Sequence, residues 1–137
     1  MTFVLDASVT LSWCFRDEAS PESLAILDRL ENEPALVPSI WPLEVANILA
    51  VAERRRRIVA EEISEFVGLL ARLTIRLDES TGERGLTEIL ALARDASLSS
   101  YDAAYLDLAL RAGLPLATRD KALAEAARRA GVTVMTG

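Results

Sequence analysis

Short apolar runs alternate with longer segments of helical periodicity along this chain, and this alternation constrains the fold most. Such an order is typical of a parallel sheet whose strands are joined by helices that cover it. The predicted strands are Phe3–Asp6, Ala35–Pro38, Thr74–Leu77, Pro115–Thr118 and Thr133–Met135. The predicted helices are Ser8–Phe15, Pro21–Glu31, Ile40–Arg57, Ala60–Leu73, Gly82–Ala96, Ser100–Ala112 and Lys121–Ala130. We therefore expect an α/β fold of three layers, with a parallel sheet of about five strands flanked by helices.

One helix face and two helix ends can be placed from local patterns. The apolar residues that recur at helical spacing are Tyr101, Ala104, Tyr105, Leu108 and Ala109. Gly113 and Gly131 each follow a predicted helix, where a left-handed residue commonly ends it. At 137 residues, with no internal repeat and no long linker, the chain is expected to form a single domain over residues 1–137.

The inventory of reactive side chains excludes several classes of enzyme. The chain has no histidine and a single cysteine, Cys14. Zinc sites, Ser-His-Asp triads and Cys-His nucleophiles are therefore excluded. A lone cysteine also favours a reducing compartment, and the first residues lack the pattern of a secretory signal. We expect a cytoplasmic protein whose chemistry uses carboxylates, hydroxyl groups or basic side chains.

The apolar segment Ala35–Ala52 is not expected to cross a membrane. It contains Pro38, Pro42 and Glu44, which a membrane-spanning helix would carry at considerable cost. We interpret it as a strand followed by the start of a buried helix, and no membrane partner is expected.

The net charge of −6 limits how the chain could bind nucleic acid. Broad capture of a phosphate backbone needs clustered Lys and Arg, so any such contact is expected to be local. Arg119 and Lys121 flank Asp120 and are placed to meet a phosphate. The run Arg54–Arg57 spreads around the end of its helix, so that a solvated helix end and an RNA contact through Arg54 are both open alternatives.

Three aspartates lie where predicted strands end or helices begin. Asp6 ends the first strand, Asp120 follows Thr118 by two residues, and Asp102 opens a helix. In an open parallel sheet, ligands bind beyond the carboxyl ends of the strands, so these are candidate site residues. Each also has a structural alternative, because Asp6 and Asp120 could cap a helix and Ser99-x-x-Asp102 matches a capping box.

Glu44 lies in an unusually apolar stretch. From Ile40 to Ala52 the only polar side chains are those of Glu44 and Asn47, three residues apart on one helical face. A buried carboxylate without a partner is costly, and no Lys or Arg lies one turn away. The alternatives are a partner from a distant part of the chain and simple exposure to solvent.

Four carboxylates gathered in one place would repel one another strongly. At about 6 Å and an effective dielectric constant of about 20, six pairwise repulsions sum to roughly 16 kcal/mol. This exceeds the roughly 5–15 kcal/mol net stability of a typical domain. Protonation would relieve the repulsion, and so would a divalent cation. Oxygen ligands without imidazole or thiolate favour Mg²⁺ or Mn²⁺ over zinc.

Four blocks of sequence together resemble the PIN domain family, and within it the VapC-type toxins of bacterial toxin-antitoxin pairs. The blocks are Val4-Leu-Asp-Ala-Ser8, Glu44-Val-Ala-Asn-Ile-Leu49, Ser99-Ser-Tyr-Asp-Ala-Ala-Tyr-Leu106 and Leu116-Ala-Thr-Arg-Asp-Lys-Ala-Leu123. One block alone would be weak evidence. Their order, at this chain length, makes the resemblance specific, and it spans nearly the whole chain.

The resemblance implies a metal-dependent ribonuclease of a toxin-antitoxin system. It marks as catalytic and metal-binding the acids Asp6, Glu44, Asp102 and Asp120, with Ser8 and Thr118 as supporting hydroxyl groups. It also implies Mg²⁺ or Mn²⁺ as cofactor, an RNA substrate, a cognate antitoxin and a homodimer. Asp107 lies about 140° around its helix from Asp102 and is expected to point away from the site, while Asp95 is expected on the surface.

Other interpretations are compatible with the same residues. A PIN-like protein could act as a protein-binding scaffold without catalysis, although none of the expected acids is missing. An aspartyl-phosphate phosphatase usually has Asp-x-Asp after its first strand, whereas this chain has Asp6-Ala-Ser8. Trp13, Phe15 and Trp41 are expected in the core, and the alternative is an exposed apolar groove for a partner helix.

Overall fold

Five parallel strands form a single sheet, in the order β3-β2-β1-β4-β5, in the computed structural model, which describes residues 2–137. The strands are β1 (Phe3–Leu5), β2 (Ala35–Pro38), β3 (Ile75–Asp78), β4 (Leu116–Thr118) and β5 (Val134–Thr136). In the central strand, Val4 pairs with Leu36 on one side and with Leu116 on the other. All three residues of β1 are buried, as expected for a parallel strand covered on both faces.

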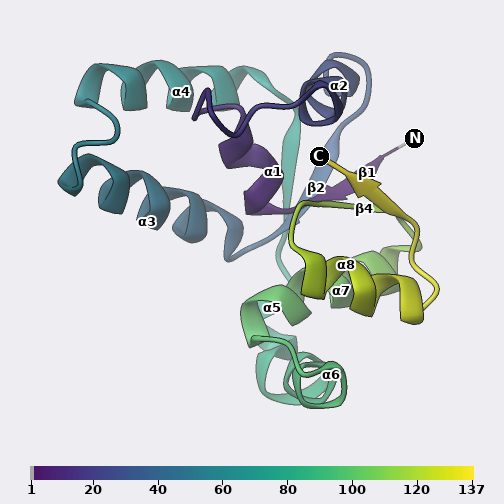
Figure 1. The fold of residues 1–137 in the computed structure, drawn as a ribbon. Helices are drawn as coiled ribbons and strands as arrows, with labels where there is room; N and C mark the ends of the chain where they lie inside the picture. The colour runs from purple at the N-terminus through teal and green to yellow at the C-terminus, as the bar shows by residue number, and fades with distance from the viewer. Residues whose placement is uncertain (1) are drawn as a thin grey trace.

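Helices cover both faces of this sheet (Figure 1). They are α1 (Ala7–Ser12), α2 (Pro21–Arg29), α3 (Trp41–Arg54), α4 (Ala60–Arg72), α5 (Thr81–Arg84), η1 (Gly85–Ile89), α6 (Leu90–Ala96), α7 (Ser100–Ala112) and α8 (Lys121–Arg129). In Figure 1, α1 to α4 lie on one side of the sheet and α5 to α8 on the other. The prediction of an α/β fold with a parallel sheet of about five strands between helices is therefore confirmed.

The order of the strands reverses at β1. From β1 the chain moves outward through β2 to β3, then crosses to β4 on the other side of β1 and ends at β5. The neighbouring strands β1 and β4 therefore form a topological switch point, where open parallel sheets bind their ligands beyond the carboxyl ends of the strands. Asp6 follows β1 directly and Asp120 follows β4 by two residues, so both lie at this point.

The predicted elements match the observed ones closely, with one exception. Each strand lies within one residue of its predicted limits, and most helices end within three residues of theirs. The continuous helix predicted over Gly82–Ala96 is wrong, because η1 interrupts it as a π-helix, in which the N–H of Leu90 donates to the carbonyl of Gly85. This wider turn changes the phase of the helix, so that Arg84, directly before η1, and Ile89, its last residue, both reach α7.

The structure confirms the predicted ends of α7 and α8 and most of the apolar face predicted for α7. Gly113 and Gly131 have φ angles of 65° and 84° and follow α7 and α8, as predicted. Most of the predicted face of α7 is buried, including Tyr105. Tyr101 is the exception, because it lies in the first turn with 60% of its surface exposed.

The aromatic residues near the start of the chain belong to the core. Phe15 and Trp41 are buried and Trp13 is partly buried, as predicted. The indole N–H of Trp41 donates to Thr10 Oγ1 at 3.1 Å, and that of Trp13 donates to the carbonyl of Ser23 at 2.8 Å. Within residues 2–137, no helix combines the length and the apolar character that crossing a membrane requires.

Candidate active site

Asp6 lies at the switch point directly after β1, and only 4% of its surface is exposed. Its Oδ2 atom accepts hydrogen bonds from Ser8 Oγ and from Thr118 Oγ1, both at 2.7 Å. Burial raises the pKa of Asp6, the two hydroxyl donors lower it, and the nearby charge of Asp120 raises it again. The balance leaves the pKa of Asp6 above its ordinary value, so a positive charge beside this carboxyl would be favoured.

The same two hydroxyl groups tie the loop after β1 to the loop after β4. The backbone N–H of Arg119 donates to Ser8 Oγ at 3.0 Å, and that of Asp120 donates to Thr118 Oγ1 at 3.1 Å. Each hydroxyl group therefore accepts a hydrogen bond from the loop after β4 and donates one to Asp6. This arrangement fixes the Asp6 carboxylate relative to the backbone of Asp120.

Asp120 is the N-cap residue of α8. Its Oδ1 atom accepts from the N–H of Leu123 at 2.9 Å, so the helix-capping alternative describes this residue correctly. Asp120 also lines a pocket of about 360 Å³ together with Arg119, Lys121 and Arg128. Helix capping and a place in a site are therefore compatible here.

Asp102 lies in the first turn of α7, where Ser99 is the N-cap residue. The backbone N–H of Asp102 donates to Ser99 Oγ at 3.1 Å. The Asp102 carboxyl is about half-buried, and its burial together with the charges of Asp6 and Asp120 raises its pKa to about 6. Asp102 is therefore protonated and ionised in comparable amounts at mildly acidic pH.

Glu44 lies in the first turn of α3 and has its partner on α7. The Tyr105 hydroxyl donates to Glu44 Oε1 at 2.7 Å, across 61 residues of sequence. Burial raises the pKa of Glu44, the bond from Tyr105 lowers it, and the charges of Asp6 and Asp102 raise it. Of the two alternatives for Glu44, the distant partner is right. This partner is a neutral hydroxyl, which leaves the negative charge of Glu44 uncompensated.

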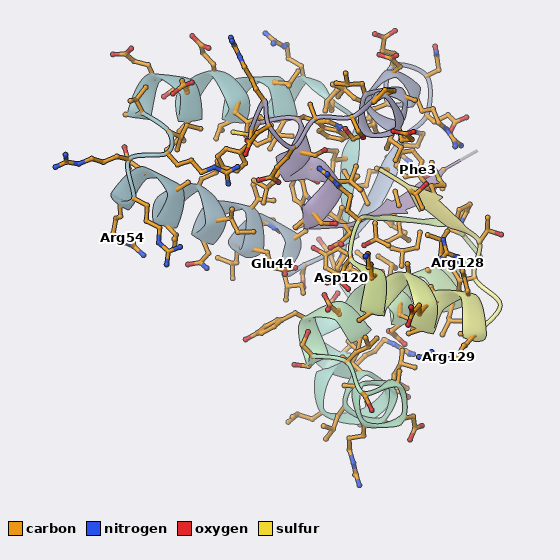
Figure 2. The ribbon with its side chains drawn as sticks, in the orientation of Figure 1. Phe3, Glu44, Arg54, Asp120, Arg128 and Arg129 are labelled. Carbon is orange, nitrogen blue, oxygen red and sulfur yellow. The ribbon has the colours of Figure 1, made fainter. Side chains whose placement is uncertain are left out.

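These four residues, which we call the acid cluster, come from four separate segments of the chain: Asp6, Glu44, Asp102 and Asp120. Their mutual effects on pKa show that their charges interact. Figure 2 shows Glu44 and Asp120 at the edge of the sheet between α3 and α8. The structure thus gathers the predicted acids at the carboxyl edge of the sheet.

The donors of the acid cluster suit a hard divalent cation, although the cluster is not a preformed metal site. In the described part of the chain, no three carboxyl or thiol side chains converge tightly enough to hold an ion as they stand. The ion pairs among residues 2–137 all lie outside the cluster. Four carboxylates without a cationic partner, three of them with raised pKa, are the donor set that Mg²⁺ or Mn²⁺ prefers.

Comparison with known families identifies the fold. The family model of the PIN domain matches residues 3–129, a range that contains the whole acid cluster. The chain belongs to the PIN domain family. PIN domains are generally metal-dependent nucleases, in agreement with the donors of the cluster. No curated protein sequence matches the chain significantly.

Solved structures share the complete fold of this PIN domain at low sequence identity. VapBC2 from Rickettsia felis, bound to a DNA fragment from its promoter, has 14% identity and a TM-score of 0.71, over 100% of this chain and 99% of that one. PAE2754 from Pyrobaculum aerophilum has 18% identity and a TM-score of 0.65, over 98% and 90%. FitAcB from Neisseria gonorrhoeae has 21% identity and a TM-score of 0.59, over 98% and 96%.

Asp107 lies outside the acid cluster of this PIN domain, in a separate network of ion pairs. Its carboxylate accepts from Arg84 at 2.9 Å and from Arg111 at 3.0 Å, and Arg111 also pairs with Asp78 at 2.7 Å. Burial raises the pKa of Asp107, but the bonds from the two arginines outweigh it and the pKa is lowered. The expectation that Asp107 points away from the site agrees with this placement.

The basic residues considered as RNA contacts lie in two places. Arg119 and Lys121 are exposed beside Asp120. Arg54 is exposed in the last turn of α3, at the far end of that helix from Glu44 (Figure 2). Asp95 is exposed, as expected.

Tyr105 is the residue of this PIN domain that the sequence patterns missed. The sequence pattern places it only on an apolar face, yet its hydroxyl is the partner of Glu44. The available signal was its position three residues after Asp102, one helical turn away on the same face. A tyrosine there can pack its ring in the core while its hydroxyl reaches the site.

Proposed function

We propose that this PIN domain is a metal-dependent endoribonuclease that hydrolyses RNA phosphodiester bonds. The observation that carries the proposal is the gathering of the acid cluster at the switch point, with Asp6 held by two hydroxyl groups. Family membership supports it, because PIN domains are generally nucleases. The lack of histidine supports a mechanism that depends on carboxylates.

The acid cluster would hold Mg²⁺ or Mn²⁺ through its carboxylate oxygens. Such an ion, when bound, polarises the scissile phosphate and acidifies water. Ser8 and Thr118 hold the Asp6 carboxylate in one orientation. Glu44 or Asp120 accepts the proton of the attacking water as general base. The water oxygen bonds to phosphorus while the bond to the leaving oxygen breaks, and no covalent bond to the protein forms.

The protein partners that we propose are a cognate antitoxin and a second copy of the chain. The antitoxin is suggested by the similar VapBC2 and FitAcB structures, which are toxin-antitoxin complexes. A groove of about 600 Å³ between α3 and α4, lined mainly by apolar side chains such as Ala50, Val67 and Leu70, offers such a partner an apolar surface. The alternative is that the apolar side chains of this groove serve only to pack α3 against α4. We propose that this protein and its antitoxin act in the cytoplasm.

RNA cleavage by the purified, antitoxin-free protein tests this function. We expect single-stranded RNA to be cut with Mg²⁺ or Mn²⁺ and to stay intact with a chelator. Asp6→Asn, Asp102→Asn and Asp120→Asn should each lower the rate about a hundredfold or more while the protein stays folded. Asp95→Asn, which removes an exposed acid away from the cluster, is the matched control and should cut normally.

The outcome also separates the other two interpretations. A folded protein that cuts no RNA with either metal would support the scaffold. Release of phosphate from a phosphomonoester would support the phosphatase, although Ser8 occupies the position of its second Asp and donates to Asp6. Cleavage that persists in the chelator or in the Asp102 and Asp120 variants would contradict our assignment of the acid cluster.

A further inference from the structure

A pocket of about 370 Å³ lies against the acid cluster between the start of α3 and the start of α7. Its lining residues are Ile40, Leu43, Glu44, Asn47 and Tyr101. Glu44 belongs both to this pocket and to the acid cluster, and Tyr101 directly precedes Asp102. A molecule bound in the pocket would therefore touch the acid cluster.

Two of these side chains are large, apolar and exposed. Tyr101 exposes 60% of its surface and Leu43 exposes 73%, beside a cluster of negative charge. The second tyrosine on the same helix, Tyr105, is fully buried and its hydroxyl is bonded to Glu44. Packing of the core therefore explains Tyr105 but not Tyr101.

We propose that this pocket binds one nucleobase of single-stranded RNA, next to the phosphate that is cleaved. The inference rests on the proposed ribonuclease function and adds a base-binding subsite to it. The ring of Tyr101 offers a face for stacking, and Ile40 and Leu43 offer apolar surface for the base. The side-chain amide of Asn47 has both donors and an acceptor for the edge of a base.

The acid cluster also favours a nucleobase over other apolar occupants. A base presents a neutral face to Tyr101 while its phosphate lies beside the carboxylates, where bound metal would neutralise the charge. Stacking on a tyrosine requires the base to leave its own stack, which a single strand permits more readily than a duplex. The subsite therefore predicts a preference for single-stranded RNA.

The first test measures cleavage by the full-length protein with Mg²⁺. We expect Tyr101→Ala to raise KM about tenfold, because stacking on one aromatic side chain is lost, with a much smaller change in kcat. Tyr101→Phe keeps the ring and should recover the loss. Leu86→Ala, which truncates a side chain 88% exposed on η1, is the matched control.

The second test pairs the variant with a change in the substrate. An RNA that lacks the base next to the cleaved bond should bind wild-type protein about tenfold more weakly, and Tyr101→Ala should show no further loss with this RNA. Binding is measured by fluorescence anisotropy in the Asp6→Asn background, so that the RNA is not consumed. This arm reports on the subsite even if cleavage is absent.

Each outcome decides a different question. If wild-type protein does not cut RNA with metal, the proposed function fails. If it cuts RNA but Tyr101→Ala leaves both KM and RNA affinity unchanged, the subsite does not exist. If Tyr101→Ala alters dimerisation or antitoxin binding but not RNA affinity, the exposed patch is a protein contact and the proposal is overturned.

Discussion

Asp6 shows at the scale of single residues how the fold buries a carboxylate and fixes its orientation. Its burial raises the pKa, and the bonds from Ser8 and Thr118 offset only part of that effect. Sequence reasoning could mark Asp6 because it ends an apolar strand. The family resemblance implied a supporting role for Thr118, but no local pattern could show that this residue, 112 positions away, donates to the same carboxylate oxygen as Ser8, because only the pairing of β1 with β4 brings it to Asp6.

The hydroxyl of Tyr105 makes this residue a positioning residue for Glu44. Tyr105→Phe removes the hydroxyl group and keeps the ring in the core. We expect the apparent Mn²⁺ affinity to fall about tenfold, because groups that hold a metal ligand in place typically contribute that much. Titration of Mn²⁺ followed by its electron paramagnetic resonance signal measures the affinity directly.

A double variant separates this effect from a general loss of structure. If Tyr105 acts through Glu44, Glu44→Gln with Tyr105→Phe should bind Mn²⁺ no more weakly than Glu44→Gln alone. Additive losses in the double variant, or an unchanged affinity in Tyr105→Phe, would show that the bond does not position Glu44.

At the scale of elements, local pattern determined most of what could be predicted. Strand positions followed from apolar β-branched runs, and the ends of α7 and α8 followed from glycines with positive φ. The π-turn of η1 was missed because its cause is not local. It depends on α7, to which Arg84 and Ile89 both have to reach.

The network of Asp78, Arg84, Asp107 and Arg111 joins α5 and the end of β3 to α7. The Asp107 side chain is only 7% exposed and pairs with both arginines, so that Asp107→Asn leaves two guanidinium groups without their shared counter-charge. We expect the free energy of unfolding to fall by about 2–4 kcal/mol, since the arginines are partly exposed and the pair is not fully desolvated. Urea denaturation measures the change.

An exposed ion pair provides the control for this prediction. Asp17→Asn breaks the pair with Arg57, in which both side chains are well exposed, and should cost less than about 1 kcal/mol. RNA cleavage per folded molecule should be unchanged in Asp107→Asn, because this residue lies outside the acid cluster. A loss of stability no larger than that of Asp17→Asn would show that the network does not hold α7.

At the scale of the whole molecule, the acid cluster depends on the strand order. Its members lie at residues 6, 44, 102 and 120, and the switch at β1 brings together the segments that follow β1 and β4. The sequence could identify these residues by type and by position relative to the elements. The raised pKa values of Asp6, Glu44 and Asp102 depend on burial and on distances between segments, which no local pattern contains.

The acid cluster should make the stability of the whole protein depend on pH and on divalent metal. Asp102 has a folded-state pKa of about 6, above its ordinary 3.8. Between these values the folded state holds a proton that the unfolded state has released, so stability is lost as pH rises from about 4 through about 6. The raised pKa values of Asp6 and Glu44 act in the same direction. The lowered pKa values of Asp78 and Asp107 act in the opposite direction, but only below about pH 4.

We therefore expect the Tm in a chelator to fall between about pH 4 and pH 7, and to fall less in Asp102→Asn, which cannot ionise there. Mg²⁺ or Mn²⁺ at pH 7 should raise the Tm by about 5–10 °C at a concentration about a hundredfold above its Kd, because the ion binds only the folded state. Asp102→Asn should reduce this response, whereas Asp95→Asn should keep both the pH dependence and the response to metal. Differential scanning calorimetry over this pH range, with and without metal, measures both effects. Two results together would mean that the four carboxylates do not act as one charged cluster. The first is a Tm that does not change when metal is added, and the second is an equal change of Tm with pH in wild type and Asp102→Asn.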